Sequence, residues 1–67
     1  MAYFIRINLL KDLGEIKINL NNITAVSLEK EDNLKTVVIS FVNNSDIKLV
    51  EGKHILDAKK TYDKFPC

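Results

Sequence analysis

The stretch FVNNSDIKLVEG, residues 41–52, decides the fold because it joins two alternating apolar runs through a cluster of turn-forming residues. This pattern predicts a β-hairpin, and the position of its loop determines which side chains share a face. A two-residue turn at Asn43-Asn44 suits the tolerance of asparagine for left-handed backbone. That turn, however, would place the apolar Ile39 opposite Lys48.

A three-residue loop over residues 43–45 gives the better match of apolar side chains. It pairs Phe41 with Ile47 and Ile39 with Leu49, and it holds Ser45 at positive φ. Two mispaired aliphatic residues cost roughly 2 to 4 kcal/mol, whereas one strained serine costs about 1 kcal/mol. We therefore predict the three-residue loop.

Three further segments alternate in the same way, so the chain is predicted to form five strands. Their expected ranges are 3–10, 15–20, 24–30, 36–42 and 46–51. Gly14 provides a turn after the first strand. The asparagines at 21–22 break the alternation, because an inward-facing Asn22 would be a costly buried amide. Residues 21–23 are therefore expected to form a corner or bulge.

After Gly52 the apolar period changes from two to between three and four. Ile55, Ala58, Tyr62 and Phe65 then form one stripe of a helix, predicted over residues 53–65 and ended by Pro66. The predicted class is α+β, mainly β, in a single domain over residues 1–67. The expected architecture is a five-stranded antiparallel meander with one C-terminal helix packed on a face. The bent segment between the second and third strands could curl the sheet into a small open barrel.

The size of the chain limits the stability that its own core provides. Sixty-seven residues give a modest core, and domains of this size often add disulfides, a metal or a partner. The single cysteine, Cys67, cannot form an intrachain disulfide. The single histidine, His54, is too few for a zinc site, and no cofactor motif is present. Oligomerisation remains, and we expect a homodimer.

The charge pattern argues against a nucleic-acid partner. The net charge is +1, and one arginine and nine lysines are interleaved with acidic residues instead of being clustered. No signal peptide or membrane-spanning apolar stretch is recognisable, so we expect a cytoplasmic protein without membrane contact. The abundance of Ile, Lys and Asn suits a bacterial or phage gene.

Residues for catalysis are not found in any recognisable arrangement. The lone His54 has no predicted nucleophile beside it, and with only two glycines the chain has no phosphate-binding loop. The sequence therefore indicates that the protein is not an enzyme.

The sheet face opposite the predicted helix is the candidate interaction surface. It would carry five apolar residues and a polar rim, and such exposed apolar patches mark interfaces. The predicted interface residues are Phe4, Leu10, Val38, Val42 and Val50, with Arg6 at the rim. The resulting hypothesis is a small non-catalytic protein-interaction module that self-associates or docks on a larger protein. The alternative is a nucleic-acid or nucleotide-binding module that uses Arg6, Lys17 and Lys48. The partner, the biological process and the oligomeric number are not encoded in any recognisable motif.

The segments FIRIN, INLNNITAVS and DNLKTVVISFVNNSDIKLVEG, in this order, resemble the small flagellar FlbD/SwrD-type proteins over residues 4–56. The hairpin of that family tends to carry Asn-Gly where this chain has Asn44-Ser45, and the opening TRLNG of the family is missing. The resemblance implies an accessory role in bacterial motility through protein contacts.

Overall fold

Five antiparallel strands and one C-terminal helix make up the computed structural model, which describes residues 3–65. The strands are β1 (Phe4–Asn8), β2 (Glu15–Asn19), β3 (Ile23–Glu31), β4 (Leu34–Phe41) and β5 (Asp46–Val50), and the helix is α1 (Ala58–Asp63). Short 3-10 turns, η1 (Lys11–Leu13) and η2 (Leu20–Asn22), follow β1 and β2. The predicted fold class is confirmed. The strands are not closed into a barrel.

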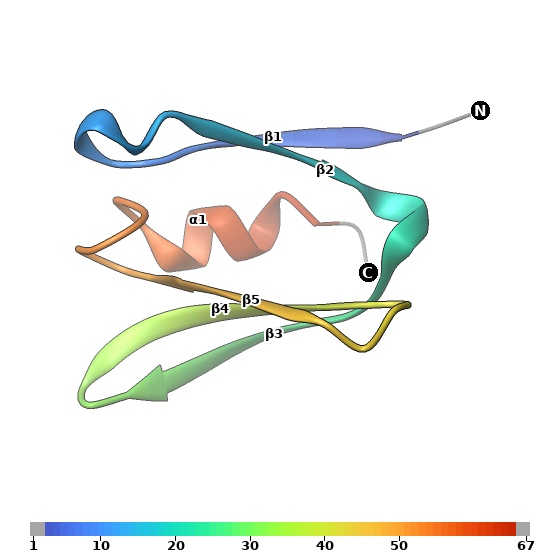
Figure 1. Cartoon of the computed structure of the whole chain (residues 1–67). Coiled ribbons are helices and arrows are strands. Elements are labelled where there is room, and N and C mark those ends of the chain that lie inside the picture. The colour runs from blue at the N-terminus through green and yellow to red at the C-terminus, as the bar shows by residue number, and fades with distance from the viewer. Residues whose placement is uncertain (1–2, 66–67) are drawn as a thin grey trace.

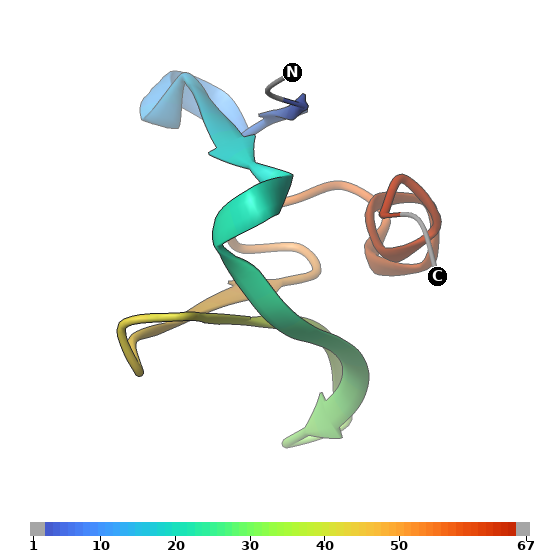
Figure 2. The same ribbon diagram turned by 90° about the vertical axis from the view of Figure 1, so that its right-hand side faces the viewer.

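The strands form two separate sheets instead of one continuous meander. β1 pairs with β2, and the second sheet has the order β3-β4-β5. The two sheets lie as layers one above the other, with α1 between them on one side (Figures 1 and 2). Residues of α1 pack against β3 and β4. The molecule is therefore a small sandwich in which the helix fills one side of the space between the layers.

The corner between the sheets lies where the asparagines interrupt the alternation. η2 covers Leu20–Asn22, and the side chain of Asn19 accepts a hydrogen bond from the N–H of Asn21 at 3.0 Å. A register shift follows between Ile23 and Ala25. The prediction of a corner or bulge at residues 21–23 is confirmed.

The core lies between the layers and takes residues from both sheets and the C-terminal segment. Its buried members are Ile7, Ile18, Val37, Ile39, Leu49, Ile55, Ala58 and Phe65. Ile5 faces Ile18 across the β1–β2 ladder, and Ile7 faces Ile16. The alternation predicted for these strands therefore selects the correct inner face.

The β4–β5 hairpin has a three-residue loop, but the loop starts one residue earlier than predicted. The N–H of Phe41 donates to the C=O of Ser45 at 2.9 Å, so residues 42–44 form the loop. Ile39 lies opposite Ile47, and the predicted pairs of Phe41 with Ile47 and of Ile39 with Leu49 are wrong by two residues. A shift of two keeps the same side chains on the inner face.

The physical reason for the shift is the choice of residue for the left-handed position. In the observed loop Asn44 has φ 68°, whereas the predicted loop would place Ser45 there. Asparagine adopts this conformation more readily than serine. The Asn43 carboxamide oxygen also accepts hydrogen bonds from the N–H and the hydroxyl of Ser45, at 3.2 Å and 2.6 Å.

The helix is shorter than the predicted range 53–65. Gly52 has φ 88°, and the C=O of Val50 accepts hydrogen bonds from the next turn, so the chain folds back before it becomes helical. Asp57 is extended and caps α1 by accepting a hydrogen bond from the N–H of Lys60 at 3.1 Å. Ile55 is buried as predicted, but it belongs to the preceding turn and not to the helix.

Candidate protein-interaction surface

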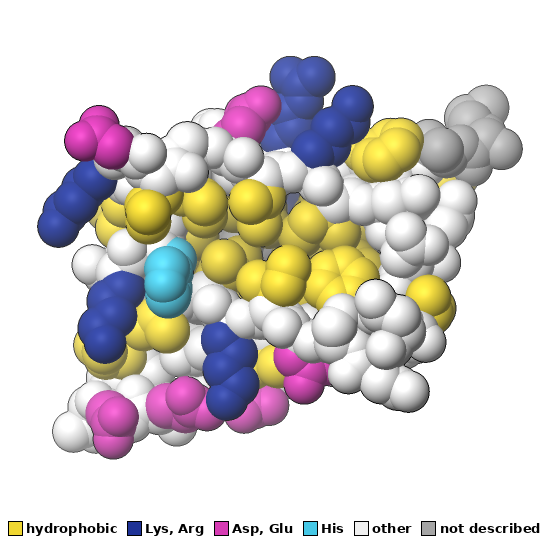
Figure 3. All heavy atoms as spheres, in the orientation of Figure 1, with side chains coloured by type: hydrophobic (Ala, Val, Ile, Leu, Met, Phe, Trp, Pro, Cys, Tyr) yellow, Lys and Arg dark blue, Asp and Glu magenta, His cyan; other side chains and the backbone are white. Residues whose placement is uncertain are grey.

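The side of the sandwich opposite α1 is open, and we call the apolar depression on it the open groove. It is lined by residues of β1, β2, η2 and the β4–β5 hairpin and has a volume of about 450 Å³. Its lining residues are Phe4, Ile16, Lys17, Ile18, Asn19, Asn22, Phe41 and Ile47. Hydrophobic side chains are visible along the seam between the two layers (Figure 3). The groove therefore exposes part of the apolar inner surface of the protein.

The exposure of this groove follows from the short helix. Ile39 and Ile47 are cross-strand neighbours on the inner face of one sheet. Ile39 is 0% exposed, whereas Ile47, on the outermost strand, is 37% exposed. α1 packs against β3 and β4. On the inner face of β5, Leu49 is buried in the core, whereas Ile47, nearer the hairpin loop, lines the groove. The same sheet face is thus a core on one side and a surface on the other.

In the part of the chain that the structure describes, no strand pairs with the outer edge of β5, and this edge borders the groove. β5 is an outer strand of its sheet, with β4 as its neighbour. The hydrogen bond between Phe41 and Ser45 identifies these residues as a hydrogen-bonded pair of the ladder. Because such pairs alternate with non-hydrogen-bonded ones, Asp46 and Lys48 direct their N–H and C=O groups away from β4. These groups are available to another strand.

The far end of the β5 edge is covered by the chain itself. Val50 has the same orientation as Asp46 and Lys48, but its N–H donates to His54 Nδ1 at 3.0 Å. Its C=O accepts from the N–H groups of Lys53 and His54 at 3.0 Å and 2.8 Å. His54 therefore has a structural role as the cap of this edge, and the uncovered part of β5 is limited to residues 46–48.

β2 provides a second unpaired edge on the other layer. The N–H of Leu9 donates to Gly14 C=O at 2.7 Å, and the N–H of Leu20 donates to Tyr3 C=O at 2.9 Å. The alternation from these two pairs directs the main-chain groups of residues 15, 17 and 19 away from β1. Both layers therefore end in an edge strand that could accept hydrogen bonds from a partner.

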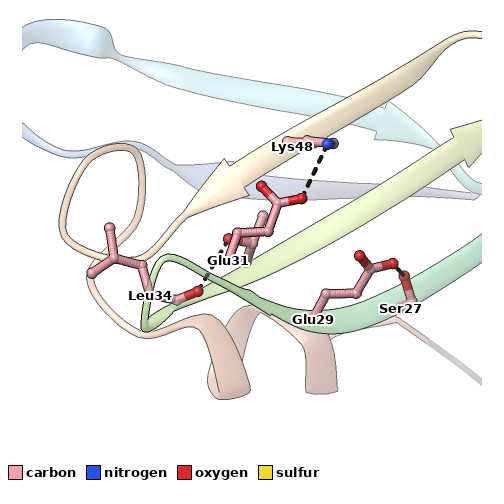
Figure 4. A network of polar contacts seen from close by, with 6 residues as sticks. Ser27, Glu29, Glu31, Leu34 and Lys48 are labelled. Carbon is pink, nitrogen blue, oxygen red and sulfur yellow. Dashed lines mark hydrogen bonds and ion pairs between the residues drawn. The ribbon is translucent and has the colours of Figure 1, made fainter.

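The outer face of the β3–β4–β5 sheet is polar and already covered. Lys48 Nζ on β5 lies 3.2 Å from Glu31 Oε1 on β3, so the pair reaches across β4 (Figure 4). Thr36 and Val38 lie on this face of β4 and are buried, Val38 being 9% exposed. The aliphatic part of a lysine readily covers such a surface. This face is therefore not an open apolar patch.

The six residues predicted as the interface do not come together. Phe4 and Arg6 lie on the outer face of β1, where Phe4 also borders the open groove, and half-buried Leu10 precedes η1. Val38 is buried on the other sheet, half-buried Val50 lies beside His54, and Val42 is exposed in the hairpin loop. Since the two sheets split at η2, their outer faces point in opposite directions and cannot form one patch (Figure 1).

The apolar groove residues Ile16, Ile18, Phe41 and Ile47 were assigned to the core by the sequence reasoning, because they alternate with polar residues on the correct face. Phe4 is the one groove residue that was predicted as part of an interface. A signal for their exposure was nevertheless present. Five strands place more apolar residues on the inner face than a helix of the observed length can cover. Asp57, directly before Ala58, is a typical N-cap residue and could have indicated the short helix.

A small basic patch lies on the outer face of the β1–β2 sheet. Arg6 and Lys17 are cross-strand neighbours, and Lys17 Nζ lies 4.7 Å from the centroid of the Phe4 ring. Lys64 Nζ donates to the C=O of Arg6 at 3.3 Å, which brings a third cation nearby. Lys48, predicted with Arg6 and Lys17 as a ligand-binding residue, lies on the other sheet.

Polar side chains elsewhere have structural roles. Asp57 caps α1, and Lys59 Nζ lies 2.9 Å from both carboxylate oxygens of Asp63. This hydrogen bond and the charge of Asp63 raise the pKa of Lys59. Within residues 3–65, no three His, Cys, Asp or Glu side chains are grouped as a metal site would need. Cys67 lies outside this range.

No helix within the described range 3–65 has the length and apolar character to cross a membrane.

A comparison of the chain with protein-family models, curated proteins and solved structures gives no match. The resemblance to FlbD/SwrD-type proteins therefore stays a prediction.

Proposed function

We propose that this protein is a small non-catalytic protein-interaction module that binds its partner through the open groove and the strand edges beside it. The observation that supports this most is the contrast between Ile39, fully buried, and its neighbour Ile47, exposed on the same sheet face. A partner that covers Ile47, Phe41 and Ile16 removes apolar surface from water at little cost in conformational entropy, because the β-strands already hold these side chains.

The chemistry of the groove favours an extended polypeptide as the ligand. A strand added to an open sheet edge gains main-chain hydrogen bonds, and its alternate side chains enter the apolar pocket. The groove offers both elements, since the outward-facing groups of β2 and β5 flank its apolar lining. We place this function in the cytoplasm, as expected from the sequence. The Ile-, Lys- and Asn-rich composition suits a gene of a bacterium or a phage.

The groove is tested by one charged substitution and a matched control. Ile47→Glu places a carboxylate in the groove, and Leu56→Glu makes the same change at a residue that is 80% exposed and outside the groove. Both tagged variants and the wild type are used to capture proteins from the native host. The captured protein is then purified and titrated calorimetrically.

We expect Ile47→Glu to weaken binding by roughly tenfold or more, because a charge buried in an apolar contact is costly. Leu56→Glu should bind like the wild type. Circular dichroism verifies that both variants are folded. Equal binding by all three proteins would contradict the assignment of the groove as the binding surface.

The basic patch supports a second candidate function, binding of single-stranded nucleic acid. Like charges directly opposite on a sheet repel each other, and Arg6 and Lys17 stand in this relation beside the exposed ring of Phe4. A phosphate would relieve that repulsion, and a base could stack on the ring. Titration of a fluorescent oligonucleotide tests this candidate. Binding should weaken steeply with salt and disappear in an Arg6→Gln/Lys17→Gln variant. Salt-independent binding, or none, would reject it.

A further inference from the structure

The exposed edge of β5 has a charge pattern that is complementary to itself. Its uncovered part reads Asp46-Ile47-Lys48, with an acid and a base on the outer face and an isoleucine between them on the inner face. The main-chain groups that point outward belong to the two charged residues. This arrangement specifies a partner more narrowly than the groove alone does.

We propose that β5 pairs with β5 of a second copy of this chain, antiparallel about a two-fold axis that passes beside Ile47. This inference rests on the proposed function and identifies a partner for the same open side. The outward main-chain groups of Asp46 form hydrogen bonds with those of Lys48 in the second copy. By symmetry, Lys48 of the first copy pairs in the same way with Asp46 of the second. The two symmetric pairs together exchange about four main-chain hydrogen bonds. The two three-stranded sheets become one continuous sheet.

Charge selects this register from its alternatives. Outward-facing residues can meet in three two-fold registers, which place Asp46 opposite Asp46, Asp46 opposite Lys48, or Lys48 opposite Lys48. The first and third put like charges directly opposite each other, which is destabilising. The second gives two opposite-charge pairs and brings the exposed Ile47 side chains of both copies together on the inner face. His54 closes the edge at Val50, so longer registers are blocked.

Contacts within the chain also fix the position of the β5 edge before any pairing. The hairpin tip is anchored to the corner between the sheets, because the N–H of Val42 donates to the C=O of Asn22 at 2.8 Å. Glu31 already holds Lys48 on the outer face, where both side chains are about half exposed. In the dimer, Lys48 would lie between Glu31 and Asp46 of the second copy. A cation between two carboxylates keeps its original contact and gains another.

The test is a charge-exchange experiment followed by sedimentation equilibrium. Because the contact is short, the wild type should dimerise weakly, with a dissociation constant on the order of 100 µM. Asp46→Lys places lysines opposite lysines, and Lys48→Asp places aspartates opposite aspartates. We expect each variant alone to associate at least tenfold more weakly than the wild type. An equimolar mixture of the two variants should recover association, since every pair across the axis is again of opposite charge.

Two controls separate the edge contact from other effects. Glu31→Gln removes the intramolecular ion pair of Lys48 and should leave a measurable dimer. Glu15→Lys makes the charge reversal on the β2 edge and should dimerise like the wild type. In the wild type, NOEs between isotope-labelled and unlabelled copies should connect Ile47 to Ile47.

A monomeric wild type at near-millimolar concentration would overturn the self-pairing, and so would failure of the mixed variants to associate. Neither result affects the proposed function. That proposal is tested by the capture of a foreign partner and by the loss of this binding in the Ile47→Glu variant. Conversely, a dimer that follows the charge-exchange pattern would stand even if no foreign partner were captured.

Discussion

The two sides of this sandwich use the same kind of side chain for different purposes. On the closed side, α1 lies between the layers, and Ile7 of β1 and Val37 and Ile39 of β4 are fully buried. On the open side, Ile16, Phe41 and Ile47 face the same space but remain partly exposed. The difference teaches that, in a domain this small, the length of one short helix determines which inner-face side chains are covered and which stay exposed. Apolar alternation alone does not distinguish a core residue from a binding residue.

The largest expected effect on stability distinguishes Ile39 on the closed side from its cross-strand neighbour Ile47 on the open side. Ile39→Ala should lower the free energy of unfolding by about 2 to 5 kcal/mol, because it leaves a cavity in the core. Ile47→Ala removes the same atoms from a partly exposed site and should cost about 1 kcal/mol or less. Urea unfolding of both variants measures the difference. Equal losses would mean that the open side is covered in solution.

The next effect concerns the hairpin that forms the open side. Asn44 holds a left-handed conformation at φ 68°, so Asn44→Ala should cost about 1 to 2 kcal/mol. Asn44→Gly is the matched control and should be close to neutral, because glycine adopts positive φ without strain. Thermal unfolding of the pair is the measurement. An alanine variant as stable as the glycine variant would show that the loop has moved to another register.

A smaller effect is expected on the closed side, at the start of α1. Asp57→Ala removes the side chain that caps the helix and should cost about 1 kcal/mol. Asp63→Ala breaks an exposed ion pair at the other end of α1 and should change stability by less than about 0.5 kcal/mol. If Asp57→Ala has no effect on unfolding by urea, the helix does not depend on this cap for docking.

The smallest effect is the titration of Lys59. The hydrogen bond and charge of Asp63 raise the pKa of Lys59, so the pair contributes stability that is present below the unfolded-state pKa and lost as pH rises through the folded-state value. The lysine is exposed, and the effect on unfolding should be too small to measure. Asp63→Asn should return the pKa toward the ordinary lysine value in an NMR titration. An unchanged pKa would mean that the pair does not persist in solution.

The strands and their inner faces could be predicted from the sequence because period-two alternation carries this information directly. Ile16 and Ile18 alternate with charged or polar neighbours, and their orientation is as expected. The hairpin loop was displaced by one residue because the prediction compared residues 43–45 only with a turn at Asn43-Asn44. The observed loop over residues 42–44 keeps the same inner face, and the preference of Asn44 for left-handed backbone favours it. Such local preferences are worth about 1 kcal/mol, which is enough to decide between two registers that keep the same inner face.

The division into two sheets could not be predicted with the same certainty. The asparagines at the corner indicated a break in the alternation. Whether such a break bends one sheet or separates two sheets depends on whether the strands on either side of it pair with each other or pack face to face. The predicted interaction surface depended on whether the strands form one sheet or two. With one sheet, Phe4 and Val38 would share a face; with two, they point in opposite directions and the seam becomes the open side.

The corner at η2 has a consequence for the order in which this protein folds. Within the described residues 3–65 it is the only covalent link between the two sheets. The β1–β2 ribbon on its N-terminal side is a two-stranded hairpin, which is marginally stable on its own. The β3–β4–β5 meander is made of contacts between neighbouring segments, and these close quickly. We therefore expect the meander to form first, although β1 and β2 leave the ribosome earlier. Larger φ-values at Val37 and Leu49 than at Ile5 and Ile16 would be the kinetic signature of this order.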